Sequence, residues 1–350
     1  MERKIEVGVL GATGMVGQQF VNQLRDHPWF DLTWLAASER SAGKPYHEAA
    51  NWTQNSPIPE AIASRGVHLS KPESGTPRLV FSALDPSGAG EIEQAFAAAG
   101  HFVVSNSKNH RMDADVPLLI PEVNADHAGL IAVQRNNRGW SGAIVTNPNC
   151  STIAMVMGLA PLKPFGIKKV LASTMQAISG AGYPGLPSMD ITANVIPYIG
   201  GEEEKMQQET LKLLGNFKDD RVELLDAVVS AHCNRVGVVD GHMVAVSVEL
   251  EQKPGIAELE AAFVSFRGVP QEKNLPTAPK QPVHLMSQAD RPQPRRDALI
   301  EGGMAVSVGR VRECPVLDYK FVVLGHNTIR GAAGAAVLNA ELMLTEGLLD

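Results

Sequence analysis

The 350-residue chain has little of what marks membrane, secreted or nucleic-acid-binding proteins. Its formal net charge is −7 and no Lys/Arg cluster offsets that balance, so no nucleic-acid partner is expected. No apolar run approaches the roughly 20 residues of a membrane-spanning helix. The first residues enter a predicted strand at once and leave no room for a secretory signal. We therefore expect no membrane partner.

Cysteine is also scarce, which excludes two further kinds of protein. Cys150, Cys233 and Cys314 are too few and too widely spaced for a disulfide framework or a zinc cluster. A cytoplasmic location is therefore expected, and no metal is predicted. Cys233 and Cys314 are expected to be inert buried thiols, the usual state of a protein cysteine.

The first part of the chain alternates predicted strands and helices. It begins with one predicted β-α-β unit, which consists of a strand Ile5–Leu10, a helix over 18–27 and a strand over 32–37. Further elements are predicted as strands over 79–83, 102–105 and 143–146 and a helix over 91–99. This alternation is typical of a parallel, doubly wound sheet.

The pattern changes after Asn149. Over 170–324 the predicted strands, such as 242–250 and 304–312, alternate apolar with polar residues, which indicates an antiparallel sheet with one covered face. The segment 276–296 is interpreted as a long excursion or a subunit-contacting loop, and 328–344 as a helix that packs back on the first domain. The predicted division is a first domain over 1–148, completed by 326–350, and a second over 149–325.

Three glycines follow the first strand with the spacing G-x-x-G-x-x-G. Glycine permits a tight turn, close approach of the backbone to a pyrophosphate, and close packing of the next helix on the strand. The helix N-terminus offers free N–H groups to phosphate. The sequence therefore predicts a dinucleotide site formed by Gly11, Thr13, Gly14, Met15, Val16 and Gly17.

The residues after the second strand indicate which dinucleotide binds. An NAD site usually has a carboxylate here for the ribose hydroxyls, whereas this chain has Ser38. Because Ser38, Arg40 and Ser41 can bind a 2′-phosphate, NADP (NADPH) is predicted. Glu39 lies one residue further on, so an NAD site or a merely solvated turn stays open as the alternative.

Cys150 is predicted to be a catalytic nucleophile. Asn149 is a good N-cap and Pro148 ends any earlier helix, so Cys150 falls near the start of a helix that continues through the apolar stretch 153–162. Positive charge at a helix start stabilises a thiolate, and free N–H groups there hold an oxyanion. A thiolate attacks an aldehyde or acyl carbon covalently, which predicts an NADP-dependent dehydrogenase of an aldehyde or acyl phosphate.

Two further residues are candidates to assist this thiol. A neutral His242 can shuttle the proton of a hemithioacetal. It shares a strand face with Val244 and Val246, as a core histidine also would. Arg235 precedes the same turn and can bind a carboxylate bidentately. Both roles stay open on these residues alone.

Six motifs occur along nearly the whole chain, in the order GATGMVG, NPNCST, QAISGAGYPG, GEEEK, HCNRVGVVDGH and GGMAVSVGRVR. Together they resemble the aspartate-semialdehyde dehydrogenase family, in the branch of archaea and fungi. The resemblance implies an α/β fold like that of glyceraldehyde-3-phosphate dehydrogenase. Its N-terminal part is a Rossmann-type doubly wound parallel sheet, and its second part is an α+β catalytic and dimerisation domain with a mainly antiparallel sheet.

The resemblance also implies a reaction and an assembly. L-4-aspartyl phosphate and NADPH would interconvert with L-aspartate 4-semialdehyde, NADP+ and inorganic phosphate, and reduction would be the physiological direction. This reaction belongs to the biosynthesis of lysine, threonine, methionine and isoleucine from aspartate. A homodimer or homotetramer is implied, because the family's dimer forms at the second domain's sheet.

Residue roles follow from the motifs. Cys150 would form the thiohemiacetal and thioester, His242 would be the acid/base, and Gln176 would orient the substrate. The implied substrate-binding residues are Arg235 for the carboxylate, Glu202 (with its two neighbouring glutamates as alternatives) for the amine, Lys205, Lys108 and Arg111 for the phosphate, and Asn149. The implied further cofactor-binding residues are Ser82, Ala83, Leu84, Ser179, Gly180 and, at the nicotinamide, Asn327.

Three alternatives stay open. A malonyl-CoA reductase or an N-acetyl-glutamyl-phosphate reductase of the same superfamily would keep the thiol, the histidine and the NADP site. A CoA thioester, however, lacks the carboxylate and amine that Arg235 and the acid of GEEEK favour. An NADP-binding sensor protein would keep the fold and lose the chemistry. The joint presence of Cys150, Gln176, Arg235 and His242 argues against a sensor.

Overall fold

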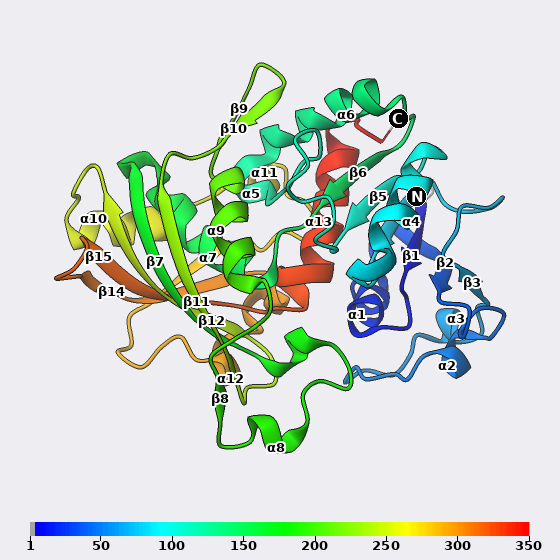
Figure 1. Cartoon of the computed structure of the whole chain (residues 1–350), viewed down its shortest axis with the longest axis horizontal. Helices are drawn as coiled ribbons and strands as arrows, with labels where there is room; N and C mark the ends of the chain where they lie inside the picture. Colours follow the sequence, from blue (N-terminus) through cyan, green and yellow to red (C-terminus); the bar gives the residue numbers. More distant parts are fainter. Residues whose placement is uncertain (1–3, 350) are drawn as a thin grey trace.

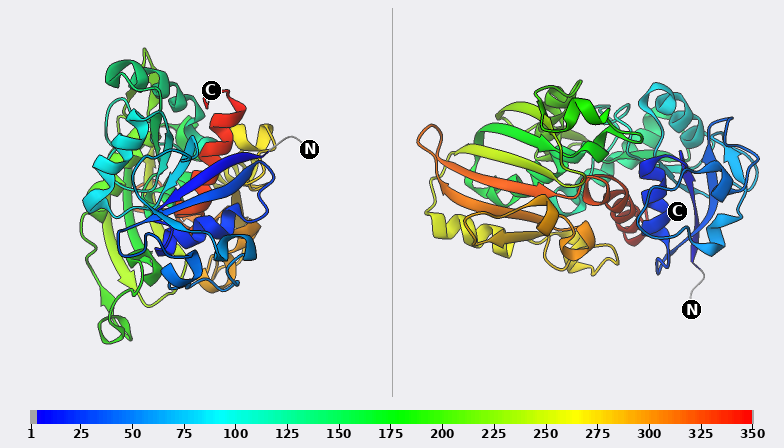
Figure 2. Two further views of the ribbon diagram at one scale, coloured as in Figure 1. Left: turned by 90° about the vertical axis from the view of Figure 1, so that its right-hand side faces the viewer. Right: turned by 90° about the horizontal axis from the view of Figure 1, so that it is seen from below.

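The computed structural model describes residues 4–349. The molecule is elongated, with a parallel sheet at one end and a larger mixed sheet at the other (Figures 1 and 2). Helix α13 (Gly334–Thr345), near the C-terminus, lies where the two parts meet (Figure 1). None of the helices in residues 4–349 combines the length and apolar character needed to cross a membrane.

The first sheet has six parallel strands in the order β3-β2-β1-β4-β5-β6. They are β1 (Ile5–Leu10), β2 (Phe30–Ala37), β3 (Val67–Leu69), β4 (Leu79–Ser82), β5 (Phe102–Ser105) and β6 (Ala143–Thr146). The strand order reverses between β1 and β4, and doubly wound sheets bind ligands at such a switch point. The predicted parallel, doubly wound sheet is confirmed.

Helices cover both faces of this sheet, which explains why every residue of β4, β5 and β6 is buried. Helices α1 (Met15–Leu24) and α13 share one core with the sheet, in which Phe20 stacks on Phe81. Helix α4 (Pro86–Ala98) covers the other face. The remaining short helices of this part are α2 (Tyr46–Ala49), α3 (Glu60–Ala63), α5 (Pro121–Asn124) and α6 (Leu130–Arg138).

The predicted helix starts were too late in the chain. The helix placed at 91–99 begins at Pro86, where Asp85 accepts a hydrogen bond from the N–H of Ser87 and proline occupies the first helical position. The helix placed at 18–27 is α1, which begins at Met15. In both cases apolar spacing marked the buried middle of the helix, whereas the cap determines its start.

The second sheet has seven strands in the order β13-β14-β15-β12-β7-β11-β8. They are β7 (Ile167–Gln176), β8 (Val195–Ile196), β11 (Val228–Val236), β12 (His242–Leu250), β13 (Val283–Met286), β14 (Val306–Glu313) and β15 (Tyr319–Gly325). Four neighbouring pairs are antiparallel, and β7–β11 and β13–β14 are parallel. The mainly antiparallel character is confirmed in a mixed sheet.

Three helices cover one face of this sheet: α7 (Cys150–Leu159), α9 (Glu202–Leu213) and α10 (Ile256–Ser265) (Figure 1). Along β12, fully buried residues alternate with half-buried ones, because only one face is covered. On the other face Leu171 is 46% exposed. This open face has the apolar and polar mixture expected of a sheet that another surface can cover.

The remaining elements connect these layers. They are the hairpin β9 (Asn216–Lys218) and β10 (Arg221–Glu223), and the short helices α8 (Ser188–Ile191), α11 (Val269–Glu272) and α12 (Pro294–Asp297). The segment 276–296, interpreted as a long excursion or a subunit-contacting loop, contains β13 and most of α12. Thr277 in this segment donates its N–H to Glu341 of α13, 3.0 Å away.

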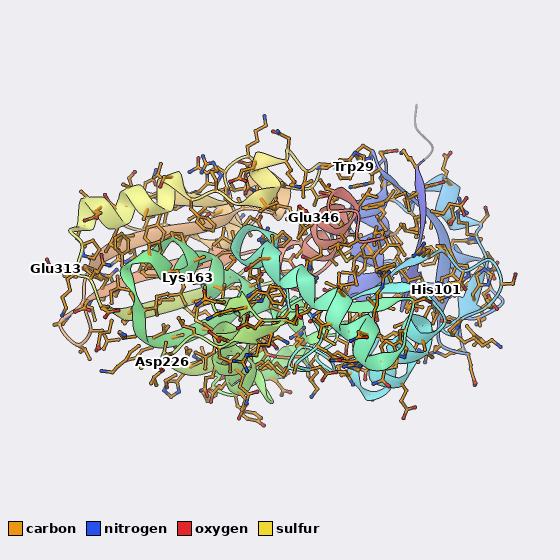
Figure 3. The ribbon with its side chains drawn as sticks, turned by 90° about the horizontal axis from the view of Figure 1, so that it is seen from above. Trp29, His101, Lys163, Asp226, Glu313 and Glu346 are labelled. Carbon is orange, nitrogen blue, oxygen red and sulfur yellow. The ribbon has the colours of Figure 1, made fainter. Side chains whose placement is uncertain are left out.

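The C-terminal segment predicted as one helix over 328–344 consists of a π-helical turn, η5 (Ile329–Ala333), followed by α13. Helix α13 packs on the parallel sheet through Ala336, Val337, Ala340 and Met343. Its C-terminal end lies beside Trp29, as the labelled Glu346 shows in Figure 3.

Candidate active site

A cleft of about 860 Å³ runs from the first β-α turn to the start of α7. It is lined by fourteen of the residues that the sequence singled out, which are Thr13, Gly14, Met15, Val16, Arg40, Ser41, Ala83, Leu84, Arg111, Asn149, Cys150, Ser179, Gly180 and Asn327. The predicted dinucleotide turn and the predicted nucleophile therefore lie in one continuous cavity.

Ten of the predicted site residues do not line this cleft, which are Gly11, Gly17, Ser38, Ser82, Lys108, Gln176, Glu202, Lys205, Arg235 and His242. Lys108 is exposed on the loop after β5, and Ser38 is exposed after β2, where its carbonyl accepts the N–H of Ser41 at 2.9 Å. Ser82 is buried and donates its hydroxyl to Glu93 at 2.6 Å. The side chains of Ser38 and Lys108 face solvent, and that of Ser82 lies in the core of the first part.

Of the three glycines in the turn after β1, two are required for packing and one lines the cleft. Gly11 has a φ of +71°, and a Cβ there would lie 2.5 Å from the carbonyl oxygen of Ala83. A Cβ at Gly17 would lie 2.2 Å from the carbonyl oxygen of Gly11. Gly14 caps α1 with no side-chain hydrogen bond and lines the cleft. The first turn of α1 therefore offers backbone N–H groups to a pyrophosphate, which fits a dinucleotide.

Part of the cleft lining is cationic. It includes Arg40, Ser41 and Lys44, and Lys44 lies three residues after Ser41 on the same loop. Lys44 was missed, although a second cation so close in the sequence to Arg40 is itself a signal for a phosphate. Two cations and a hydroxyl suit the 2′-phosphate of NADP better than the free hydroxyls of NAD.

Cys150 is the first residue of α7, as predicted from its neighbours. Asn149 caps the helix, and its Oδ1 accepts the N–H groups of Ser151 at 2.9 Å and Thr152 at 3.1 Å. Those two N–H groups are therefore not free to bind an oxyanion. The helix start offers less oxyanion stabilisation than the sequence suggested.

The thiol itself differs from the predicted thiolate. Burial raises the pKa of Cys150 to about 12, and the nearby charge of Glu202 acts in the same direction, against the opposing cations Arg111, Arg235 and Lys205. At pH 7 the resting side chain is therefore a protonated thiol. A thiol whose pKa is raised by burial must lose its proton during the attack on substrate.

The other two cysteines differ from each other. Cys233 is buried, as predicted, and its burial raises the pKa to about 12. The prediction that Cys314 is buried is wrong, since Cys314 is only half-buried. Although burial alone would raise the pKa of Cys314, hydrogen bonds from the backbone at Leu317 and Val316 lower it.

His242, the first residue of β12, is held as a neutral ring. Its Nδ1 accepts the N–H of Ala177 at 3.0 Å, so the hydrogen of the neutral ring lies on Nε2. Burial lowers the pKa of His242 to about 3, with a further contribution from Arg235. Within residues 4–349, Nε2 is buried without a hydrogen-bond partner. The ring therefore presents a hydrogen-bond donor at Nε2. A further proton could bind only at Nδ1, which would require loss of the bond from Ala177.

Gly180 connects His242 and Arg235 to the cleft. A Cβ at Gly180 would lie 2.9 Å from Nη1 of Arg235 and 3.1 Å from Nε2 of His242. Nη1 of Arg235 also donates to the carbonyl oxygen of Ala177 at 2.7 Å. The absence of a side chain at Gly180 therefore keeps both polar groups next to the cleft.

The side chain of Asn327 joins the loop that carries Ser179 to the turn before β12. Its Nδ2 donates to the hydroxyl of Ser179 at 2.7 Å, and its Oδ1 accepts the N–H of Gly241 at 2.8 Å. The loop after β7, the turn before β12 and the end of β15 are thereby joined at the cleft. This contact holds Ser179 and Gly180 against the cofactor end of the cavity.

Helix α9 supplies the carboxylate nearest to Cys150. Oε2 of Glu202 accepts from Asn149 Nδ2 at 2.7 Å and from Gln176 Nε2 at 3.1 Å, and its Oε1 accepts from Lys205 Nζ at 2.6 Å. Although burial alone would raise the pKa of Glu202, Lys205 and these hydrogen bonds lower it. Gln176, Asn149 and Lys205 therefore form a hydrogen-bonded cluster around an ionised Glu202.

The neighbouring glutamates of the GEEEK motif face elsewhere. Oε1 of Glu203 accepts the N–H of Cys233 at 3.0 Å, and Glu204 is exposed. Of the three, Glu202 is the one that reaches the cluster at Cys150.

Two residues further along α9 were missed. Glu209 lies two helical turns after Glu202, on the same face, and contacts both Arg111 and Asn149. Nζ of Lys212 donates to the carbonyl oxygens of Arg111, Asp113 and Val116, each at 2.8 Å. Charged residues at helical spacing on a buried face were the available signal. Within residues 4–349, no group of three or more His, Cys, Asp or Glu side chains is arranged to hold a metal ion.

The chain matches two family models and several solved structures. Residues 6–131 match the semialdehyde dehydrogenase NAD binding domain, and 159–330 match the semialdehyde dehydrogenase dimerisation domain. The fold is similar to aspartate semialdehyde dehydrogenase with NADP from Candida albicans (40% identity, TM-score 0.91, 99% of this chain and 100% of that one). It is also similar to aspartate semialdehyde dehydrogenase II complexed with ASA from Vibrio cholerae (26%, TM-score 0.78, 99% of each).

Full-length relatives give the same result. The chain is 50% identical to the aspartate-semialdehyde dehydrogenase of Archaeoglobus fulgidus, over 99% of this chain and 100% of the relative. It is 47% identical to that of Schizosaccharomyces pombe, over 98% of this chain and 99% of the relative. The chain therefore belongs to the aspartate-semialdehyde dehydrogenase family.

Proposed function

We propose that the protein reduces L-4-aspartyl phosphate to L-aspartate 4-semialdehyde with NADPH, releasing inorganic phosphate, and catalyses the reverse reaction. The observation that carries the proposal is the set of charged residues around Cys150. The charges of Arg111, Arg235, Lys205 and Glu202 all act on its thiol. Three cations and one carboxylate suit a substrate that bears a phosphate, a carboxylate and an ammonium group.

In the proposed mechanism, the sulfur of Cys150 attacks the acyl carbon and forms a thioester, and phosphate leaves with the thiol proton. When bound, NADPH supplies the hydride that reduces this thioester. The Nε2–H of His242 donates a hydrogen bond to the substrate oxygen as negative charge develops there. Collapse of the resulting thiohemiacetal releases the aldehyde and the thiolate of Cys150, which takes a proton from water and returns to the thiol. We propose His242 as the acid/base, with release of its bond from Ala177 when it takes up a proton.

The substrate groups are assigned by charge. Arg235, one of whose nitrogens is already bound to a carbonyl, is proposed to bind the carboxylate through its remaining N–H groups, and Glu202 the ammonium group. Arg111 and Lys205 are proposed for the phosphate, since Nε of Arg111 is buried without a partner in residues 4–349. Gln176, which is bonded to Glu202, is proposed to orient the thioester. Lys108 is not assigned to the phosphate, because its exposed side chain does not line the cleft.

We also propose where the cofactor binds, how the chain divides into domains and how it assembles. NADP is proposed to lie on the Gly14 turn with its 2′-phosphate at Arg40, Ser41 and Lys44. The proposed domains are 1–148 with 326–350, and 149–325. A homodimer through the open face of the second sheet is proposed, or a homotetramer of two such dimers, and a cytoplasmic location is proposed on the scarcity of cysteine.

Initial rates with three substrate systems test the activity. The protein should reduce NADP+ in the presence of aspartate semialdehyde and inorganic phosphate, with a rate that depends on phosphate. Reduction of malonyl-CoA or of N-acetyl-glutamyl phosphate by NADPH should be at least about a hundredfold slower, because a pocket built around charged groups discriminates by several kcal/mol. Preference for either of those substrates would overturn the assignment.

Replacing Arg235 by Leu should lower kcat/KM for aspartate semialdehyde by about 10- to 150-fold. Charge-assisted hydrogen bonds are worth about 1.5–3 kcal/mol, and each 1.4 kcal/mol is tenfold. Steady-state kinetics with varied semialdehyde measures the loss, and Arg221→Leu on the exposed hairpin is the control. Unchanged kinetics in Arg235→Leu would show that another residue binds the carboxylate.

The cofactor assignment predicts a second change. Replacing Arg40 and Lys44 together by Ala should lower kcat/KM for NADP+ by at least about tenfold, through loss of charge-assisted bonds to the 2′-phosphate, and leave that for NAD+ nearly unchanged. Rates with each cofactor measure this, and exposed Lys71→Ala is the control. A wild-type protein that prefers NAD+ would contradict the NADP assignment.

A further inference from the structure

Glu209 is a buried carboxylate with two different charged or polar partners near the reaction centre. Its Oε1 accepts from Nη1 of Arg111 at 2.9 Å, and its Oε2 accepts the backbone N–H of Asn149 at 2.6 Å. Only 2% of Glu209 is exposed, and its side chain does not line the cleft. One carboxylate thus bridges an arginine of the cleft and the residue immediately before Cys150.

The first of these contacts sets the direction of Arg111. Nη1 is held by Glu209, and Nη2 donates to the carbonyl oxygen of Asn106 at 2.7 Å. Nε is left buried without a partner within residues 4–349, and Arg111 lines the cleft. A buried guanidinium stays charged when a carboxylate compensates it. Glu209 therefore keeps a cation in place, and the N–H groups of Arg111 that bind neither Glu209 nor Asn106, the one on Nε among them, are left for an anion.

The second contact sets the start of α7. Asn149 is held at three points, since its Oδ1 caps the helix, its Nδ2 donates to Glu202, and its N–H donates to Glu209. Glu209 thereby fixes the backbone adjoining the sulfur of Cys150. Lys212, one helical turn later, holds the loop of Arg111 through three carbonyl oxygens.

We propose that Glu209 is a positioning residue that couples the phosphate-binding Arg111 to the helix start bearing Cys150. The inference rests on the proposed phosphate-dependent reaction, and Glu209 acts there without touching the substrate. By holding both groups on one rigid carboxylate, it keeps the leaving phosphate at the distance from the sulfur that the acyl-transfer step requires.

Because both partners of Glu209 are hydrogen-bond donors, Glu209→Gln can disrupt one contact and keep the other. Both Arg111 Nη1 and Asn149 N are donors, and Glu209→Gln supplies one acceptor oxygen and one amide donor. The variant therefore satisfies one partner and opposes the other at nearly unchanged size. Glu209→Asp keeps the charge but is one methylene shorter, so it also reaches only one partner. Exposed Glu204→Gln on the same helix is the matched control.

Kinetics and alkylation of the full-length protein test this role. In Glu209→Gln we expect KM for phosphate to rise at least tenfold and kcat to fall at least tenfold, with KM for semialdehyde and NADP+ within about twofold of wild type. In an Arg111→Met background, Glu209→Gln should leave KM for phosphate unchanged and still lower kcat, because Asn149 is still released. Equal changes in all three KM values, or no change in KM for phosphate, would overturn the role.

A second readout does not depend on turnover. Inorganic phosphate should slow the iodoacetamide alkylation of Cys150, followed by mass spectrometry, and the half-protecting concentration should rise at least fivefold in Glu209→Gln and not in Glu204→Gln. If wild type is inactive on the semialdehyde but shows this protection, the proposed reaction fails and the coupling stands. If phosphate never protects Cys150, the coupling fails even when the reaction is confirmed. Loss of folding in both Glu209 variants would assign the residue to stability alone.

Discussion

Cys150→Ala should lower turnover at least about 10⁴-fold while NADPH binding stays within about twofold of wild type. The sulfur forms the covalent bond in the proposed mechanism, and loss of a nucleophile removes the pathway rather than slowing one step. The dinucleotide turn is built from separate residues around Gly14, at the other end of the cleft. Phosphate-dependent NADP+ reduction measures turnover, and quenching of protein fluorescence measures NADPH binding.

Cys233→Ala and Cys314→Ala are the controls for this result. Neither sulfur lines the cleft within the described residues, so both variants should retain most of the wild-type rate. Turnover above about 1% of wild type in Cys150→Ala would show that the reaction does not proceed through a thioester. Loss of NADPH binding in the same variant would show instead that the replacement disturbs the cavity.

Glu122→Gln should destabilise the protein by about 3–5 kcal/mol. Glu122 and Arg330 are both fully buried and joined by two hydrogen bonds of 2.7 Å. Removing the negative partner leaves the guanidinium buried and uncompensated, which is the costly way to break such a pair. Urea unfolding followed by circular dichroism measures the loss in free energy.

The effect should reach the nucleophile as well. Arg330 belongs to the π-helical turn η5, and the next residue, Gly331, packs so tightly on Cys150 that a Cβ there would lie 2.7 Å from the Cβ of Cys150. The activity of folded Glu122→Gln should therefore fall along with its stability. Replacing both residues, as Glu122→Met with Arg330→Met, should cost much less stability than Glu122→Gln alone, because an apolar replacement of a buried pair is often neutral.

An exposed ion pair is the matched control for stability. Lys273 and Glu346 lie 2.6 Å apart with side chains 37% and 40% exposed. Glu346→Gln should cost less than about 1 kcal/mol, because water and salt screen such a pair. A loss in Glu122→Gln no larger than in Glu346→Gln would contradict the assigned role of the buried pair.

Much of the fold and part of the site were predictable because their signals are local. Strand and helix periods identified the parallel sheet, and six ordered motifs identified the family. Gly11 and Gly17 are explained by contacts within one turn and with the neighbouring strand. Cys150 at a helix start is explained by Asn149, its immediate neighbour. Each of these inferences requires only residues close in the sequence or an order along the chain.

What the sequence by itself determined is therefore the fold class, the glycine turn after β1 and the place of Cys150, the proposed nucleophile, at the start of α7. The tertiary structure alone decided the state of that nucleophile and its partners. Burial makes Cys150 a protonated thiol, and the bond from Ala177 makes His242 a donor at Nε2. Glu209 meets Asn149 across 60 residues of sequence. Desolvation and long-range hydrogen bonds depend on which segments approach one another, and no local pattern encodes that approach.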